Sequence, residues 1–201
     1  MCEVEVIRSE GGEGNELCLI TRSNSKKINS LISFSSDEGK TWSEPKETPA
    51  ALSGERHKAE WVKDGDNWRL FITFRSIERS LDKIAKYAPE LKSTGWMSEG
   101  WVAWVGDWND LKEGTEGDYR VKLAHTYLGD ENAPVRSANA DTGYCGNVVF
   151  ADGTIVTSSY GRFGEWDSKA NRYVNSEKTY ILSKTVNLKD LDAVVEYFKS
   201  K

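Results

Sequence analysis

The stretch Ser35-Ser36-Asp37-Glu38-Gly39-Lys40-Thr41-Trp42 decides the fold of this chain. It matches the pattern S-x-D-x-G-x-T-W at every fixed position. The pattern predicts a tight turn in which the Asp37 carboxylate caps backbone amides and Gly39 supplies a position of positive φ. Trp42 is expected to tuck into the adjacent sheet. Because the motif is structural, it indicates a fold and carries no activity of its own.

Short antiparallel strands surround this turn. Alternating and apolar runs predict strands over 3–8, 16–22 and 30–35. Two turns that contain Asp-Gly, 64–67 and 152–153, separate further apolar runs and predict hairpins. Their strands are expected over 58–63 with 68–75, and over 147–150 with 154–160. Two more strands are expected over 101–105 and 119–123, with a polar turn or short helix over 108–114.

Each of the three hairpins carries a polar residue before its first strand and another at the end of its second strand. In an antiparallel hairpin these two positions lie at the same end. The pairs are separated by 19, 18 and 16 residues, and they are Glu3 with Arg22, His57 with Arg75, and Tyr144 with Tyr160. We therefore expect these side chains to converge on one rim.

A unit of a few strands that repeats in this way is typical of a β-propeller. The sequence predicts an all-β fold with about three such units, over 1–45, 55–128 and 141–186, in a single partial domain over 1–201. Apolar residues at helical spacing predict a helical insertion over 80–95 and a C-terminal helix over 188–201. Both helices are expected to be packing elements.

Composition excludes several classes of function. The net charge is −5, which argues against a nucleic-acid partner recognised through a basic face. No apolar run is long enough for a membrane span, and no signal peptide pattern is visible. No phosphate-binding loop or metal-ligand spacing appears, so no cofactor and no metal is expected. The three cysteines, Cys2, Cys18 and Cys145, are expected to be buried, with a Cys2–Cys145 pair left open.

The order of these features resembles the sialidase (neuraminidase) family of propellers, in which the S-x-D-x-G-x-T-W motif is the Asp-box of the BNR repeat. That family shows a Glu that opens a strand, an Arg that closes the next strand, and then an Asp-box, here Glu3, Arg22 and 35–42. Its last blade shows small residues around a Tyr, matched by 143–154. The resemblance covers most of residues 1–186 and implies the later half of a six-bladed parent.

The resemblance implies a retaining glycosidase that acts on terminal acidic sugars of the sialic acid type, with Tyr144 as nucleophile and Glu3 as its partner. A free phenol, with a pKa near ~10, needs a carboxylate to take its proton. A neutral Tyr suits a substrate that carries its own carboxylate beside the reacting carbon. Arg22 would bind that carboxylate, and the third arginine of the family's carboxylate clamp is left open among Arg56, Arg75 and Arg120. His57 and Tyr160 complete the expected substrate-binding set.

Two other functions remain open at this stage. A set of His, Tyr and Arg around a carboxylated sugar equally suits a propeller polysaccharide lyase or another uronate-acting enzyme. A non-catalytic carbohydrate-binding remnant is the third possibility. His57 is evenly balanced between rim and structural roles, whereas His125 is expected to be structural.

Three units are fewer than propellers use to close a ring. We therefore expect either a longer protein with a missing N-terminal half, or two copies that complete the ring as a homodimer. The family's acid Asp and first Arg belong to an early blade and have no counterpart in this sequence, so weak catalysis is expected from this chain alone. The compartment is not fixed by the sequence, although the family is often secreted or periplasmic.

Overall fold

The computed structural model describes residues 2–87, 89–124, 142–163, 165–169, 172–174 and 178–201. These residues form mostly antiparallel β-sheet, as the sequence predicts. The first sheet has the order β1-β2-β3-β4, with bounds Cys2–Arg8, Leu17–Arg22, Leu31–Ser35 and Lys46–Glu47. No sheet closes on itself within the described ranges, so the propeller stays a prediction.

The second and third sheets are also meanders. The second has the order β5-β6-β7-β8, with bounds Gly54–Asp64, Asn67–Ser76, Trp101–Gly106 and Tyr119–Ala124. The third has the order β13-β10-β9, with bounds Tyr180–Val186, Ile155–Gly161 and Thr142–Val149. A separate hairpin, β11 (Glu165–Asp167) with β12 (Arg172–Val174), is inserted between β10 and β13. These sheets correspond to the three expected units.

Helices occupy the connections and the C-terminal end. The segment over 80–95 contains α1 (Leu81–Tyr87) and the 3₁₀-helix η3 (Pro89–Thr94), and the C-terminal helix is α3 (Leu188–Lys199). The turn or helix expected over 108–114 is a helix, α2 (Trp108–Glu113), with a capping box formed by Asp107 and Asp110. Two further 3₁₀ turns are η1 (Glu10–Gly12) and η2 (Ala50–Leu52).

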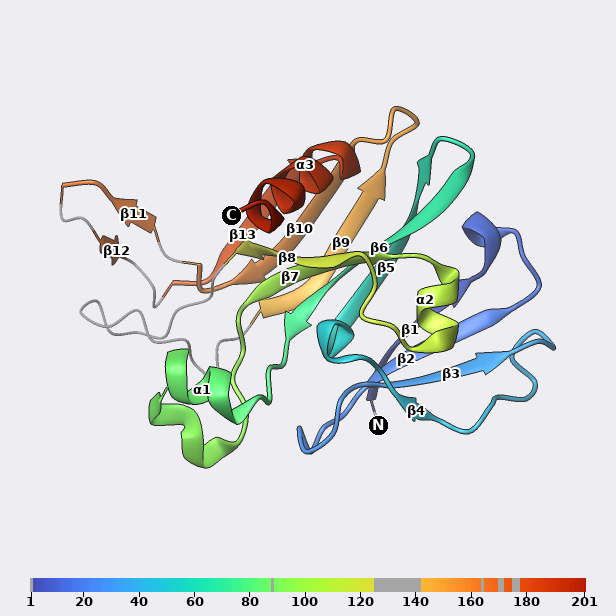
Figure 1. Cartoon of the computed structure of the whole chain (residues 1–201), viewed down its shortest axis with the longest axis horizontal. Coiled ribbons are helices and arrows are strands. Elements are labelled where there is room, and N and C mark those ends of the chain that lie inside the picture. The colour runs from blue at the N-terminus through green and yellow to red at the C-terminus, as the bar shows by residue number, and fades with distance from the viewer. Residues whose placement is uncertain (1, 88, 125–141, 164, 170–171, 175–177) are drawn as a thin grey trace.

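The first strands of the three sheets lie side by side. β5 packs against β1 on one side and β9 on the other, and Figure 1 shows the first sheet (blue) and the third sheet (orange) on opposite sides of the second. Because β1, β5 and β9 are each the first strand of a hairpin, residues at their starts meet at one end. Residues at the hairpin tips meet at the other end.

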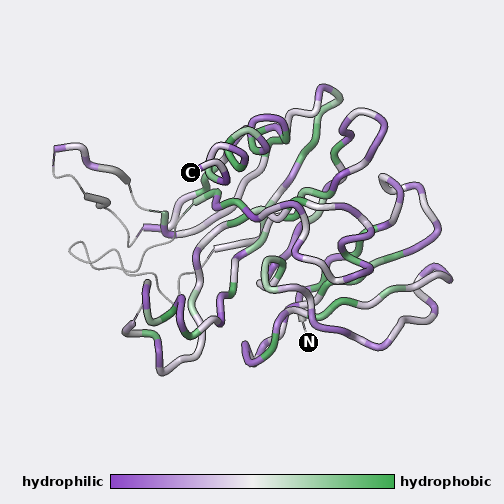
Figure 2. The backbone as a smooth tube through the Cα atoms, viewed as in Figure 1, coloured by the Kyte–Doolittle hydropathy of each residue, from purple (hydrophilic) through white to green (hydrophobic). Residues whose placement is uncertain are grey.

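The core fills the spaces between neighbouring sheets. Along β6, Leu70, Ile72 and Phe74 face the first sheet, whereas Phe71 belongs to the cluster shared with the third sheet. This alternation explains why the sequence of β6 is almost continuously apolar: it is buried on both faces. Figure 2 shows the apolar stretches in the central strands and the polar ones in the turns.

Tryptophans of β7 extend both clusters. Trp104 packs in the cluster with the first sheet and Trp101 in the cluster with the third, and both are fully buried. Cys18 and Cys145 are buried, unpaired thiols in these clusters. The Cys2–Cys145 disulfide that the sequence left open is therefore not formed.

The Asp-box forms the turn that its sequence predicts. The Asp37 carboxylate accepts from the Thr41 amide at 2.9 Å and from the Thr41 hydroxyl at 2.7 Å. These bonds, with one from Ser35, hold the pKa of the Asp37 carboxyl below its usual value. Gly39 has a φ of 78° and its carbonyl accepts from the Trp42 indole. Trp42 nevertheless remains partly exposed, rather than tucked fully into the sheet.

Candidate active site at the bulged strand starts

Three non-glycine residues adopt left-handed backbone conformations at the same place in the three sheets. Glu3, Arg56 and Tyr144 have φ values of 58°, 62° and 48°. Each of the three lies at a β-bulge near the start of β1, β5 or β9. At that bulge the register shifts between the strand and its partner, which is β2, β6 or β10. Bulges re-aim side chains, and such backbone strain in non-glycine residues is concentrated at functional sites. The shared conformation singles out this end of the molecule as the candidate site.

Tyr144 and Glu3 are directly bonded. The Tyr144 hydroxyl donates to Glu3 Oε1 at 2.7 Å. Glu3 Oε2 lies 2.7 Å from Arg22 Nη1, and Glu3 Oε1 lies 3.5 Å from Arg56 Nε. Tyr144 is 64% exposed, so its phenol oxygen can be approached from solvent. The arrangement is a phenol beside a carboxylate whose negative charge is balanced by two guanidinium groups.

Arg56 is held between two tyrosines. Its guanidinium carbon lies 4.4 Å from the centre of the Tyr144 ring, and its Nη1 donates to the Tyr160 hydroxyl at 2.7 Å. The same nitrogen donates to the Thr142 carbonyl at 2.9 Å. A Cβ at Gly143 would lie 2.4 Å from Arg56 Cδ, and the φ of Gly143 is +133°. Only glycine at position 143 therefore allows the arginine to lie so close to β9.

A second carboxylate, missed in the sequence, organises the remaining cations. Glu55 is 2% exposed and its carboxylate contacts Arg75 directly. It also lies 4.0 Å from Arg22 Nη1 and 3.6 Å from Lys26 Nζ. In sequence Glu55 resembles any surface carboxylate, and only its place before the β5 bulge distinguishes it.

Lys26 adds a fourth positive charge from the β2–β3 connection. Its ammonium lies 4.1 Å from the centre of the Trp96 ring. Burial and the neighbouring charges of Arg75, Arg22 and Arg56 lower the pKa of Lys26 below its usual value. Burial is the larger cause of that shift, and the three guanidinium groups add a crowded positive environment around Glu3 and Glu55. This is the electrostatic setting that an anionic ligand prefers.

The structure corrects the placement of His57. Its ring stacks on Phe74 with centroids 4.7 Å apart, and Nε2 donates to the Leu52 carbonyl at 3.0 Å. Burial lowers the pKa of His57 to about 4. The residue equivalent to Glu3 and Tyr144 is Arg56, one position earlier, because the bulge turns His57 inward. The equal separations of Glu3 from Arg22 and of Arg56 from Arg75, 19 residues each, are the sequence signal for this assignment.

The remaining sequence candidates divide between two places. The structure brings Arg22, Arg56, Arg75 and Tyr160 together around Glu3, Glu55 and Tyr144, at the expected rim. Arg120 lies on the outer strand β8 and pairs with Glu99 at 2.9 Å, with Glu78 at 4.0 Å. None of the contacts described for Arg120 reaches Glu3 or Tyr144. His125 lies outside the described residues.

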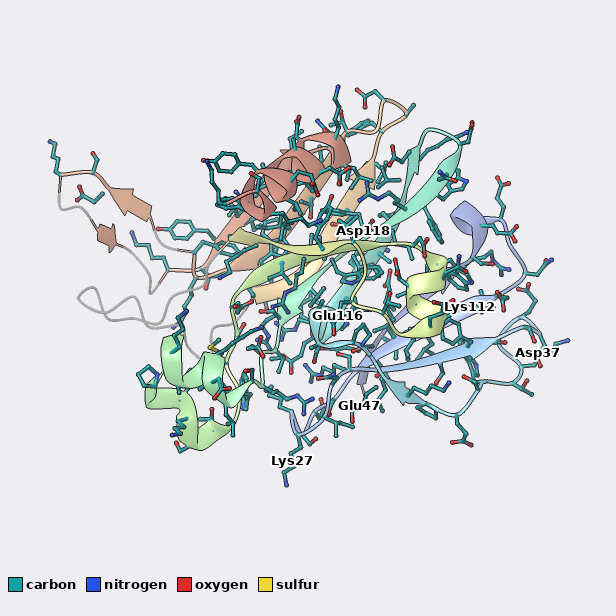
Figure 3. The ribbon with its side chains drawn as sticks, viewed as in Figure 1. Lys27, Asp37, Glu47, Lys112, Glu116 and Asp118 are labelled. Atoms are coloured by element: carbon teal, nitrogen blue, oxygen red, sulfur yellow. The ribbon has the colours of Figure 1, made fainter. Side chains whose placement is uncertain are left out.

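The Asp-box lies at the other end of the first sheet. Ser35 pairs with Leu17, the first residue of β2, whereas Arg22 is the last residue of β2. Figure 3 shows Asp37 and Lys27, which follows β2, at opposite ends of this sheet. The motif therefore holds the turn that follows β3 and does not contribute to the candidate site.

Compared with models of known protein families and with curated protein sequences, the chain matches none. None of the described helices is long and apolar enough to cross a membrane. Among the described residues, no group of His, Cys, Asp and Glu side chains is placed to hold a metal ion. Any functional assignment therefore depends on the residues of the site themselves.

Proposed function

We propose that this chain is part of a sialidase-type β-propeller and that its rim binds the carboxylate-bearing, terminal acidic sugar of a glycan. The observation that carries the proposal is the 2.7 Å hydrogen bond from Tyr144 to Glu3, with Arg22 and Arg56 beside it. Three sheets whose first strands lie side by side fit three blades of such a ring. The Asp-box between β3 and β4 fits the same architecture.

In the proposed reaction, Tyr144 is the nucleophile. Its oxygen forms a bond to the anomeric carbon as the bond to the leaving oxygen breaks, and Glu3 takes the phenol proton. Water then attacks the anomeric carbon of the tyrosyl intermediate. Glu3 returns its proton to Tyr144, which leaves as the phenol, and the ionised Glu3 takes one proton from the water, which it later releases to solvent. A neutral nucleophile suits this substrate, because an anionic one would be repelled by the substrate carboxylate.

The arginines would hold the substrate carboxylate. Arg22 already contacts both Glu3 and Glu55, and Arg75 contacts Glu55, so each is oriented before a substrate arrives. Arg56 is oriented by the two tyrosines. Pre-oriented guanidinium groups bind a carboxylate bidentately at a low entropic cost. The sequence left the third arginine that would bind the substrate carboxylate undecided among Arg56, Arg75 and Arg120. We propose Arg56 or Arg75 for this role, because Arg120 lies away from Glu3 and Tyr144.

A proton for the leaving group is the missing part of this mechanism. Losing a general acid costs roughly 10²–10⁴-fold in rate. An aryl leaving group departs without a proton, so we expect slow hydrolysis of an aryl sialoside and almost none of a natural sialylated glycan.

The test is release of the aryl group by the wild-type chain and by Tyr144→Phe, with His57→Phe as a buried control. Hydrolysis that vanishes in Tyr144→Phe and survives in His57→Phe supports the proposal. Full activity in Tyr144→Phe contradicts the nucleophile. An unsaturated, ultraviolet-absorbing product from a uronate polymer would support the lyase alternative instead, but that reaction would have to proceed without the buried His57 as its base.

A further inference from the structure

The end of the molecule opposite Tyr144 carries a hollow. It lies between the tip of the β5–β6 hairpin, η1 and α2, and has a volume of about 830 Å³. Arg56 and Asp64 are eight residues apart on β5, so the two ends are separated by roughly 26 Å of extended strand. A ligand in this hollow is therefore independent of the function proposed above.

Aromatic side chains run along the hollow and beyond it. Trp61, Trp68 and Trp108 line it, and Trp61 and Trp68 also line an adjoining hollow of about 640 Å³ that reaches Phe150. Trp68 is 40% exposed and Phe150 is 52% exposed. The two hollows share the indoles of Trp61 and Trp68. Together they are here called the tip groove, and their lining comes from the tips of all three sheets.

The indole rings of the tip groove are held in place. Trp61 Nε1 donates to the Arg8 carbonyl at 2.8 Å, and Trp108 Nε1 donates to Glu16 at 3.1 Å. The Trp68 ring packs on the backbone of Gly11, where a Cβ would lie 2.5 Å from the indole. Rigid rings with exposed surface present flat apolar faces at a low entropic cost to a ligand.

The polar groups of the tip groove are mainly hydrogen-bond acceptors. Its acidic residues include Glu10, Asp64 and Asp118, beside the amides of Asn67 and Asn109. Its three cations are all engaged. Arg69 lies within 3.3 Å of Asp64, Asp118 and Asp192, and Lys112 lies 2.9 Å from Glu16. Lys63, in the adjoining hollow, has its ammonium 5.8 Å from the centre of the Trp68 ring. Figure 3 shows Lys112 on α2 and Asp118 just before β8. An anionic ligand would meet surplus negative charge here, whereas hydroxyl groups would find acceptors.

We infer that the tip groove binds a neutral oligosaccharide chain. The faces of neutral sugar rings carry C–H groups that pack on indoles, and their hydroxyls donate to carboxylate and amide oxygens. The groove is long enough to span three sheets, which fits a chain of several sugars better than a single one. The chain would then hold a neutral glycan at one end and present the Tyr144 rim at the other.

The test is titration of the full chain with four neutral hexasaccharides, of the cello, xylo, manno and chito types, by calorimetry and tryptophan fluorescence. At least one should bind saturably. Trp68→Ala, which removes the most exposed indole of the groove, should weaken it by roughly tenfold, equivalent to about 1.4 kcal/mol. Asn109→Arg, on the exposed face of α2, should also weaken it without disturbing any sheet.

Two variants serve as controls. Trp42→Ala removes an indole of similar exposure outside the tip groove, and Tyr144→Phe changes only the opposite rim; both should bind the hexasaccharide as the wild type does. The inference is overturned if none of the four sugars binds, or if Trp68→Ala and Asn109→Arg both retain full affinity. Loss of binding in Tyr144→Phe also overturns it. So does binding of the cationic peptide hexalysine by a chain that binds none of the four sugars.

Discussion

The buried imidazole of His57 should make the protein sensitive to mild acid. An unfolded chain binds a proton at His57 with a pKa near 6.5, whereas burial lowers the pKa in the folded protein to about 4. The folded state therefore binds fewer protons, and its stability falls as the pH drops below about 6.5. Between pH 7.5 and pH 5 the linkage amounts to about 2 kcal/mol, and it levels off below pH 4.

Urea unfolding at pH 7.5 and pH 5, for the wild type and for His57→Phe, measures this effect. At pH 7.5 the variant should lose about 1 kcal/mol, because the Leu52 carbonyl loses its donor. At pH 5 the variant should be the more stable protein, because Phe keeps the stacking on Phe74 and takes up no proton. Equal losses of stability in both proteins between the two pH values would refute the buried, neutral imidazole.

Three other changes have defined outcomes. Tyr144→Phe should abolish aryl sialoside hydrolysis while leaving the urea midpoint nearly unchanged, since the Tyr144 side chain is largely exposed. Arg69→Ala should cost about 1–2 kcal/mol and should speed proteolytic release of α3, because Arg69 ties Asp192 of that helix to the second sheet; unchanged proteolysis would contradict this role. Gly117→Ala should cost about 2–4 kcal/mol, because φ is +72° and the new Cβ would lie 2.5 Å from the Trp104 indole. The matched control, Gly65→Ala, has a φ of +61° and open space around it, and should lose only about 1 kcal/mol in the same unfolding assay.

Local patterns predict most of this fold. Apolar alternation and the Asp-Gly turns locate the hairpins, because strand periodicity and turn chemistry are properties of neighbouring residues. The short strands β4, β11 and β12 carry no such signal. Their pairing depends on the neighbouring strand in space, and their own residues do not predict it.

The candidate site was predictable only in part. Glu3, Arg22 and Tyr144 follow from the family resemblance and the hairpin ends, and the structure brings them together. His57 was misplaced because a bulge inserts one residue and reverses which side chain faces the rim. Glu55 could not be recognised, because burial of a carboxylate against arginines from two other strands leaves no local pattern.

At the three bulges, the side chains of the candidate site are present at a cost in backbone strain. At the starts of β1, β5 and β9 the backbone adopts a conformation that suits glycine, yet the positions hold Glu3, Arg56 and Tyr144. Each such residue costs of order 1–3 kcal/mol that glycine would not. Where a related sequence is not selected for this site, we therefore expect glycine at these positions, because glycine adopts this conformation without strain. A homologue with glycine at all three positions would have relieved this backbone strain and lost the side chains of the candidate site. The residues at these positions therefore indicate whether a relative of this chain keeps the candidate site.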